Sequence, residues 1–227
     1  MKPSIPILLS FNAGYVDTAG FMALHGLFTA HVTGNFVTLG AALVLGTSGA
    51  VAKLLALPVF CAVVVLARLL RYRLQDAGRP VFRTLLLIKL LLLVVGAALA
   101  IRFGPFADGD SWSGLVTGMV LVAAMAVQNA VQRVHLGSAP PTTLMTGTTT
   151  QIMLDLGDRL HGVTPEQKAV IDARQFRMIR SVCAFALGCG GAALLLAWVG
   201  PWCFAVAPLI ALAAYLRELA EPMAGAA

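Results

Sequence analysis

Runs of about twenty apolar residues recur along this chain and constrain its fold more than any other feature. The clearest are residues 51–72 and 82–103, and residues 114–134, 176–199 and 202–216 are similar. About 20 apolar residues in a helix cross the hydrocarbon core of a bilayer. Hydrophobic residues make up 59% of the chain and charged residues 11%, whereas an average soluble domain carries about 25% charged residues. We therefore predict an all-α polytopic membrane protein.

A polar pentapeptide interrupts the first apolar region. Residues 8–30 are moderately apolar, His31–Asn35 reads His-Val-Thr-Gly-Asn, and residues 36–46 are apolar again. The last piece is about 16 Å long as a helix, which is too short to cross a membrane alone. We interpret the pentapeptide as a helix break inside the membrane.

A second break is predicted after residues 114–134. The segment 137–141 ends in two prolines, which remove backbone donors and restrict the residue before them. Thr142 and Thr143 are then expected to cap a short helix that ends near Gly157.

The two breaks share a layout. Met145-Thr146-Gly147-Thr148 repeats the Thr-Gly pair of the first break, 113 residues further on. Asp17 precedes Thr33 by 16 residues, and Asn129 precedes Thr146 by 17. Each copy thus contains a helix with a polar residue, a loop, a Thr-Gly pair and a short helix.

The positive charges predict the orientation. Basic residues gather in segments 68–83 and 159–180 and near the termini, at Lys2 and Arg217, whereas loop 104–113 is acidic. Since cytoplasmic loops carry the excess of Lys and Arg, we expect six crossings with both termini cytoplasmic. Eight crossings would leave half of the basic residues outside.

Six crossings divide into a 3+3 inverted repeat, in which the first helix of each half is broken. Repeat one covers residues 8–103 and repeat two covers residues 113–217, within a single transmembrane domain, 1–227. Transporters with inverted repeats and broken helices bind their substrates near the bilayer midplane.

The motifs also resemble a known family. Ala13-Gly14-Tyr15-Val16-Asp17 and Ala30-His31-Val32-Thr33-Gly34-Asn35, with Gln128-Asn129-Ala130, Pro141-Thr142-Thr143 and Met145-Thr146-Gly147, resemble the YoaK-like family of bacterial inner-membrane proteins. The resemblance covers essentially the whole chain. It departs at Thr148, where the family more often has an asparagine that matches Asn35. It implies a multi-pass protein of the bacterial inner membrane and names neither substrate nor reaction.

Helix starts at the two breaks would offer free N–H groups and a partial positive charge to a small polar or anionic solute. The candidate substrate-binding residues are Asp17, His31, Thr33, Gly34, Asn35, Gln128, Asn129, Thr146, Gly147, Thr148 and Gln151. The alternative is that the threonines only cap helices and the glycines only pack.

Titratable side chains near the breaks are candidates for proton coupling. Asp17, His25 and His31 are predicted to carry protons, because acids inside a membrane are costly and histidine titrates near neutral pH. The alternative for Asp17 is a structural hydrogen bond to the break of the other repeat.

We predict no metal site. Lys89 is expected to snorkel to a membrane surface, and Asp155 is expected to be solvated.

The predicted function is a small-solute secondary transporter, proton-coupled through Asp17 or a histidine. Alternatives are a passive channel, or a membrane-embedded enzyme or scaffold without transport. We expect no enzyme, no cofactor and no nucleic-acid partner, because hydrolytic and phosphate-binding motifs are missing from the sequence. The glycines of residues 188–191 permit a homodimer and would serve packing within the chain equally well.

Overall fold

A computed structural model describes residues 4–220, so Lys2 lies outside the described residues. Every regular element in this part of the chain is helical, which confirms the all-helical prediction. The elements are α1 (Ile5–Ala23), the 3₁₀ turn η1 (Val32–Gly34), α2 (Asn35–Leu45), α3 (Ala50–Asp76), α4 (Val81–Phe103), α5 (Trp112–His135), α6 (Met145–His161), α7 (Pro165–Val199), the 3₁₀ turn η2 (Gly200–Ala205) and α8 (Val206–Ala220).

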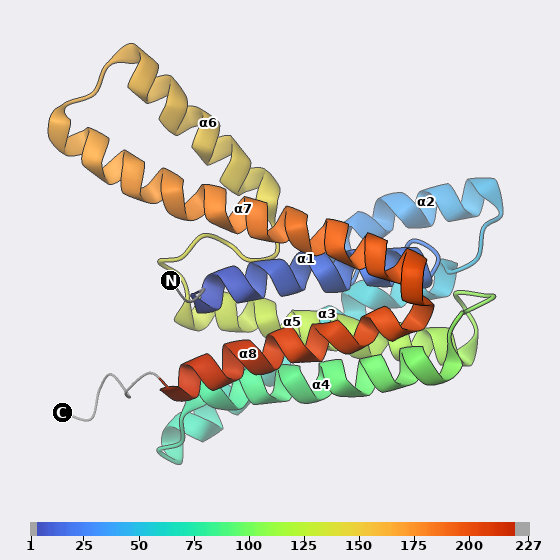
Figure 1. The fold of residues 1–227 in the computed structure, drawn as a ribbon. Helices are drawn as coiled ribbons and strands as arrows, with labels where there is room; N and C mark the ends of the chain where they lie inside the picture. Colours follow the sequence, from blue (N-terminus) through green and yellow to red (C-terminus); the bar gives the residue numbers. More distant parts are fainter. Residues whose placement is uncertain (1–3, 221–227) are drawn as a thin grey trace.

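Several of these helices are long and apolar enough to span a membrane. Four such segments occur between residues 4 and 220, namely Ala50–Asp76, Val81–Phe103, Trp112–His135 and Pro165–Ala220. The last segment folds back at η2, so that α7 and α8 run in opposite directions (Figure 1). Large apolar side chains such as Leu43 and Val44 remain exposed on the outside, which is the surface expected to meet lipid.

Helix α1 lies inside the bundle. It packs mainly along α7 and also contacts α8 and α5, while α5 packs on α3 and α4 (Figure 1). The backbones of α1 and α7 approach so closely that a Cβ atom on Gly14 would lie 2.2 Å from the carbonyl oxygen of Phe185. A Cβ atom on Gly188 would lie 2.1 Å from the carbonyl oxygen of Phe11. Glycine is therefore required on both helices at this contact.

Two irregular linkers separate the long helices from the short ones. The first linker, residues 24–34, begins earlier than predicted because His25 and Gly26 adopt positive φ angles of 54° and 84°, which end α1 at Ala23. The second linker, residues 136–144, joins α5 to α6. Leu144 is the residue that caps α6, so the prediction of a cap at Thr142 and Thr143 is wrong. Both threonines are buried instead.

Helix α6 and the first part of α7 form a hairpin that extends beyond the bundle, and residues 162–164 are its turn (Figure 1). Asp155 on α6 is fully buried and accepts hydrogen bonds from Arg174 on α7 and from Gln151. The prediction that Asp155 is solvated is therefore wrong. The Arg174 guanidinium, and then the Gln151 amide, hold the pKa of this carboxyl below its usual value despite burial.

Lys89 also differs from its prediction. Its side chain is 1% exposed, and its Nζ has no hydrogen-bond partner among residues 4–220. The residue lies about 12 Å along α4 from the start of that helix, on the buried face. Lys89 therefore does not snorkel to a membrane surface.

Candidate functional site

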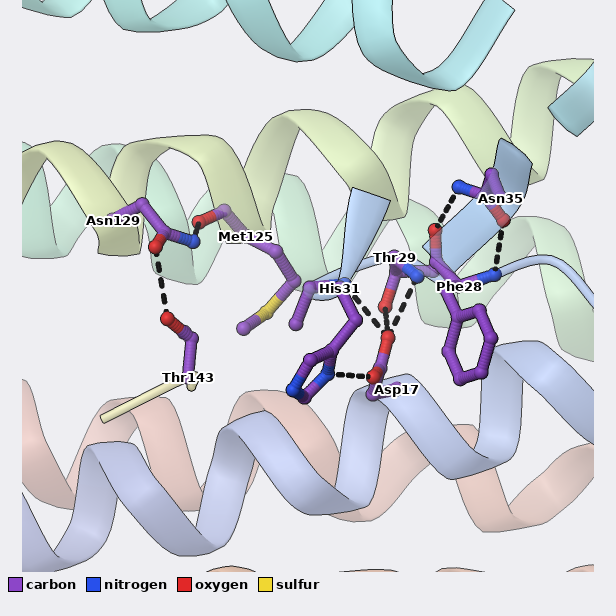
Figure 2. Close-up of polar contacts among 9 residues, drawn as sticks. Asp17, Phe28, Thr29, His31, Asn35, Met125, Asn129 and Thr143 are labelled. Carbon is purple, nitrogen blue, oxygen red and sulfur yellow. Dashed lines mark hydrogen bonds and ion pairs between the residues drawn. The ribbon is translucent and has the colours of Figure 1, made fainter. Parts of the chain in front are cut away.

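Asp17 ties the first linker to α1. Its Oδ1 accepts hydrogen bonds from the backbone N–H groups of Thr29 and Ala30, each at 2.7 Å, and from the Thr29 hydroxyl at 3.3 Å (Figure 2). His31 Nδ1 lies 2.6 Å from Asp17 Oδ2. The Asp17 side chain is buried. A linker in an apolar bundle leaves backbone donors without helical partners, and this carboxylate satisfies two of them. Asp17 thus bonds the linker that follows its own helix, so the alternative of a hydrogen bond to the second linker is wrong.

Asn35 also holds the first linker, through hydrogen bonds to the backbone of Phe28. Its Nδ2 donates to the carbonyl oxygen of Phe28 and its Oδ1 accepts from the Phe28 N–H group, both at 2.8 Å (Figure 2). Asn35 is 1% exposed. Both functional groups of the amide are engaged, so Asn35 holds the loop at Phe28.

The second linker is held in a similar way by α5. Thr143 donates its hydroxyl hydrogen to Asn129 Oδ1 at 2.8 Å (Figure 2), and Gln128 Nε2 donates to Thr142 Oγ1 at 3.0 Å. Gln128 also donates to the carbonyl oxygen of Leu9 on α1 at 3.0 Å. Polar side chains of α5 therefore fix the second linker and connect it to α1.

Sequence reasoning missed one pair of residues in this arrangement. Thr29 and Thr142 each lie four residues before a Thr-Gly pair, and each is fully buried and bonded to a polar side chain of the preceding helix. The equal spacing was present in the sequence and was the signal that could have identified them.

The threonines of the two Thr-Gly pairs line one cavity of about 560 Å³, which we call the threonine cavity. Thr33 from the first linker and Thr146 from the first turn of α6 both line it. Its other lining residues are Asp17, Thr18, Phe21, Phe28, His31, Gly34, Leu144, Phe185 and Cys189. The contribution of α7, through Phe185 and Cys189, was not foreseen, because no polar motif marks these residues.

Other predicted residues line a separate space. Gly147, Thr148 and Gln151 face a cavity of about 520 Å³ together with Asn129. The Thr148 hydroxyl is buried there and has no hydrogen-bond partner within the described part of the chain. These residues of α6 therefore do not face the threonine cavity.

A third cavity, of about 440 Å³, adjoins the threonine cavity and is called the arginine cavity here. His31, Thr33 and Leu144 line both cavities, and the arginine cavity adds Arg68, Arg71, Arg133 and Asn129 to its walls. It thus extends the polar region from the first linker toward the basic ends of α3 and α5.

The three predicted proton carriers do not converge. Asp17 and His31 are in contact, whereas the His25 imidazole lies 2.9 Å from the carbonyl oxygen of Phe106, in the loop between α4 and α5. His25, Asn35 and Gln128 line none of the three cavities described above. Among residues 4–220, no three His, Cys, Asp or Glu side chains form a group that could hold a metal ion.

The fold and the cavities define a helical membrane protein whose polar interior is built around two linkers, residues 24–34 and 136–144. Residues 5–216 match the family described as "Protein of unknown function (DUF1275)", and the chain belongs to that family. Comparison with curated proteins and with solved structures gives no significant match.

Proposed function

We propose that this protein is a secondary transporter of a small polar or anionic solute, with the threonine cavity as its binding site near the bilayer midplane. The observation that carries the proposal is that Thr33 and Thr146, 113 residues apart, line one cavity. Both lie at the start of a short helix, where free N–H groups and hydroxyls can bind a solute.

A 3+3 inverted repeat is part of the proposal. In this scheme α1 to α4 correspond to α5 to α8, and the linkers are breaks inside the membrane. Helix neighbours support the scheme, because α1 packs on α7 as α5 packs on α3, and α4 packs on α5 as α8 packs on α1. The short helices follow the same rule, since α2 packs on α3 and α6 packs on α7. Such swapped neighbours are expected of two equivalent halves.

The proposal includes a bacterial inner-membrane location, with six crossings and both termini cytoplasmic. Its support is the gathering of Lys and Arg in segments 68–83 and 159–180. Proton coupling is assigned to Asp17 and His31, which are in contact and both line the threonine cavity. A buried carboxylate beside an imidazole can exchange a proton with a solute path.

Cys189 offers a direct test, because it lines the threonine cavity. In a variant that keeps only this cysteine, a charged membrane-impermeant maleimide should modify it when added from either side of the membrane, as alternating access requires. A variant that keeps only Cys203, which is 1% exposed, is the matched control and should stay unmodified. An unreactive Cys189 from both sides would contradict the proposal.

The mode of passage is tested by uptake. Solutes that raise the unfolding temperature of the purified protein are offered to proteoliposomes over a range of concentrations. A transporter saturates, so the initial rate should reach a plateau, and Thr33→Val and Thr146→Val should both lower it. A rate that rises linearly without limit would identify a channel instead.

A further inference from the structure

We propose that the transported solute is a small organic anion with an apolar body, and that the arginine cavity is the chamber in which it first binds. This inference rests on the proposed function and names the substrate class of the same site. Its starting point is the convergence of three guanidinium groups. Arg68 and Arg71 come from α3 and Arg133 comes from α5, yet all three line a single cavity of about 440 Å³.

Within residues 4–220, no carboxylate neutralises the positive charge in this cavity. No Asp or Glu lines the cavity, and none of its three arginines forms an ion pair with a carboxylate within residues 4–220. Among the described residues, Arg71 Nε is buried without a hydrogen-bond partner, whereas Arg68 Nε donates to the Tyr72 hydroxyl at 3.1 Å. Other arginines of the chain are paired, such as Arg159 with Asp172 and Arg174 with Asp155. A guanidinium that is partly buried without an acceptor favours binding of an external anion.

Membrane topology alone does not explain this arrangement. Arginines that only orient the chain need to reach the cytoplasmic surface, and Arg68, Arg73 and Arg133 are exposed, whereas Arg71 is half-buried. Topology does not require residues of α3 and α5 to converge on a shared cavity. Arg73 lines none of the cavities described above and represents the orienting charge, whereas Arg68, Arg71 and Arg133 line one cavity and have a further role.

The remaining walls indicate what kind of anion fits. Most of the other lining side chains are aliphatic or aromatic, including Phe60, Val64, Leu85, Val134 and Leu144. Arginine binds carboxylate and phosphate oxygens through two parallel hydrogen bonds, while apolar walls favour a hydrocarbon body. The combination selects a small carboxylate with a short aliphatic or aromatic portion. The phosphate of an anionic phospholipid shares the anionic chemistry, so the test must separate the two sources.

The arginine cavity leads toward the proposed transport site. His31 and Thr33 line both this cavity and the threonine cavity, so the two spaces adjoin along the first linker. An anion held by the arginines would therefore lie next to the hydroxyl of Thr33 and the imidazole of His31. This continuity distinguishes the arginine cavity from a lipid site on the outer surface.

The test measures binding of simple carboxylates to the full chain in nanodiscs of phosphatidylcholine. Acetate, hexanoate and benzoate are titrated by calorimetry, with hexanamide and benzamide as neutral counterparts. Hexanoate and benzoate should bind saturably and more tightly than acetate, because their bodies contact the apolar walls, and the amides should not bind. Equal binding of benzoate and benzamide would overturn the proposal.

Variants locate the binding site. Arg71→Gln and Arg133→Gln should each weaken hexanoate binding by at least about tenfold, the effect of removing a charge-assisted hydrogen bond. Arg133→Lys should lose less, because it keeps the charge and loses only the bidentate geometry. Arg73→Gln removes one positive charge from the same end of α3 and should leave the affinity unchanged. An equal loss in Arg73→Gln would reduce the effect to surface charge and contradict the proposal. Unfolding temperatures of all variants verify that the fold is retained.

The lipid alternative is decided by adding phosphatidylglycerol to the nanodiscs. If the arginines hold a headgroup, hexanoate will not bind, and native mass spectrometry will find phosphatidylglycerol retained by the wild-type protein and lost in Arg133→Gln. That result would overturn the proposal. Failure of carboxylate binding is distinguishable from failure of the proposed function, because labelling of Cys189 from both sides does not depend on the charge of the solute.

Discussion

At the level of single residues, Asp17 has two roles that one substitution can separate. Asp17→Asn keeps an oxygen that can accept from the N–H groups of Thr29 and Ala30, but it removes the negative charge beside His31. We expect the fold to remain and proton-coupled uptake to be abolished. Uptake into proteoliposomes with and without a pH gradient measures the coupling, and unchanged coupling would remove Asp17 from the mechanism.

A second substitution serves as the control for Asp17. Asp17→Ala removes the acceptor as well as the charge, so two backbone donors of the linker lose their partner. A buried donor without a partner costs about 1–3 kcal/mol, and the unfolding temperature of Asp17→Ala should therefore fall below that of Asp17→Asn. Similar unfolding temperatures would show that the carboxylate does not hold the linker.

The sequence was informative about which residues are unusual and less so about their partners. Asp17 stood out as an acid in an apolar helix, and its contact with His31 is local. Its bonds to Thr29 and Ala30 depend on the path of the linker, which is set by the positive φ angles of His25 and Gly26. No apolar periodicity predicts such a path, and the alternative role considered for Asp17 was therefore a hydrogen bond to the break of the other repeat.

At the level of helices, the contact between α1 and α7 predicts unequal tolerance of two neighbouring glycines. A Cβ atom on Gly188 would overlap the backbone of α1, whereas a Cβ atom on Gly190 meets nothing within 4 Å. Gly188→Ala should lower the free energy of unfolding by about 1–3 kcal/mol through overpacking. Gly190→Ala should leave it unchanged or raise it slightly, since alanine favours a helix. Unfolding measured in the same detergent compares them, and equal effects would contradict the close approach.

The helix boundaries expected from the apolar runs of the sequence agree with the structure for some helices and differ for α7. The apolar runs predicted α3, α4 and α5 to within a few residues, because length and apolarity define a spanning helix. Helix α7 begins at Pro165, well before the apolar run at 176, since Thr164 and Gln167 form a capping box. That signal lies in the sequence as Thr-x-x-Gln, but the charges around it suggested a loop.

For the whole molecule, the proposed topology predicts that two surface positions face opposite sides of the membrane. Ala107, between α4 and α5, and Lys168, near the start of α7, are both exposed. In a cysteine-free background, Ala107→Cys should be labelled from the periplasm and Lys168→Cys only after the membrane is opened. Labelling of both from one side would contradict the inverted repeat, and the unsubstituted background controls for non-specific reaction.

The arrangement of the cavities follows from packing between helices that are distant in the sequence. Motifs marked Thr33 and Thr146, and these residues do line one cavity. Arg68 and Arg71 had been interpreted only as orienting charges, because their convergence with Arg133 depends on how α3 packs against α5. Contacts between helices that are distant in the chain leave no periodic pattern in the sequence. The threonine cavity and the arginine cavity were therefore not predictable from it.

The pairing of α1 with α7 also has a consequence for how the protein is made. The ribosome delivers α1 to the membrane long before α7 and α8 exist, yet Asn12 on α1 donates to the carbonyl oxygen of Ala207 on α8. Until synthesis is nearly complete, the polar groups of α1 must find water or the insertion machinery as temporary partners. Helices α7 and α8 therefore complete the burial of α1. If the ribosome stalls before α7, the polar groups of α1 stay unburied, and proteases of the membrane are expected to degrade the incomplete chain.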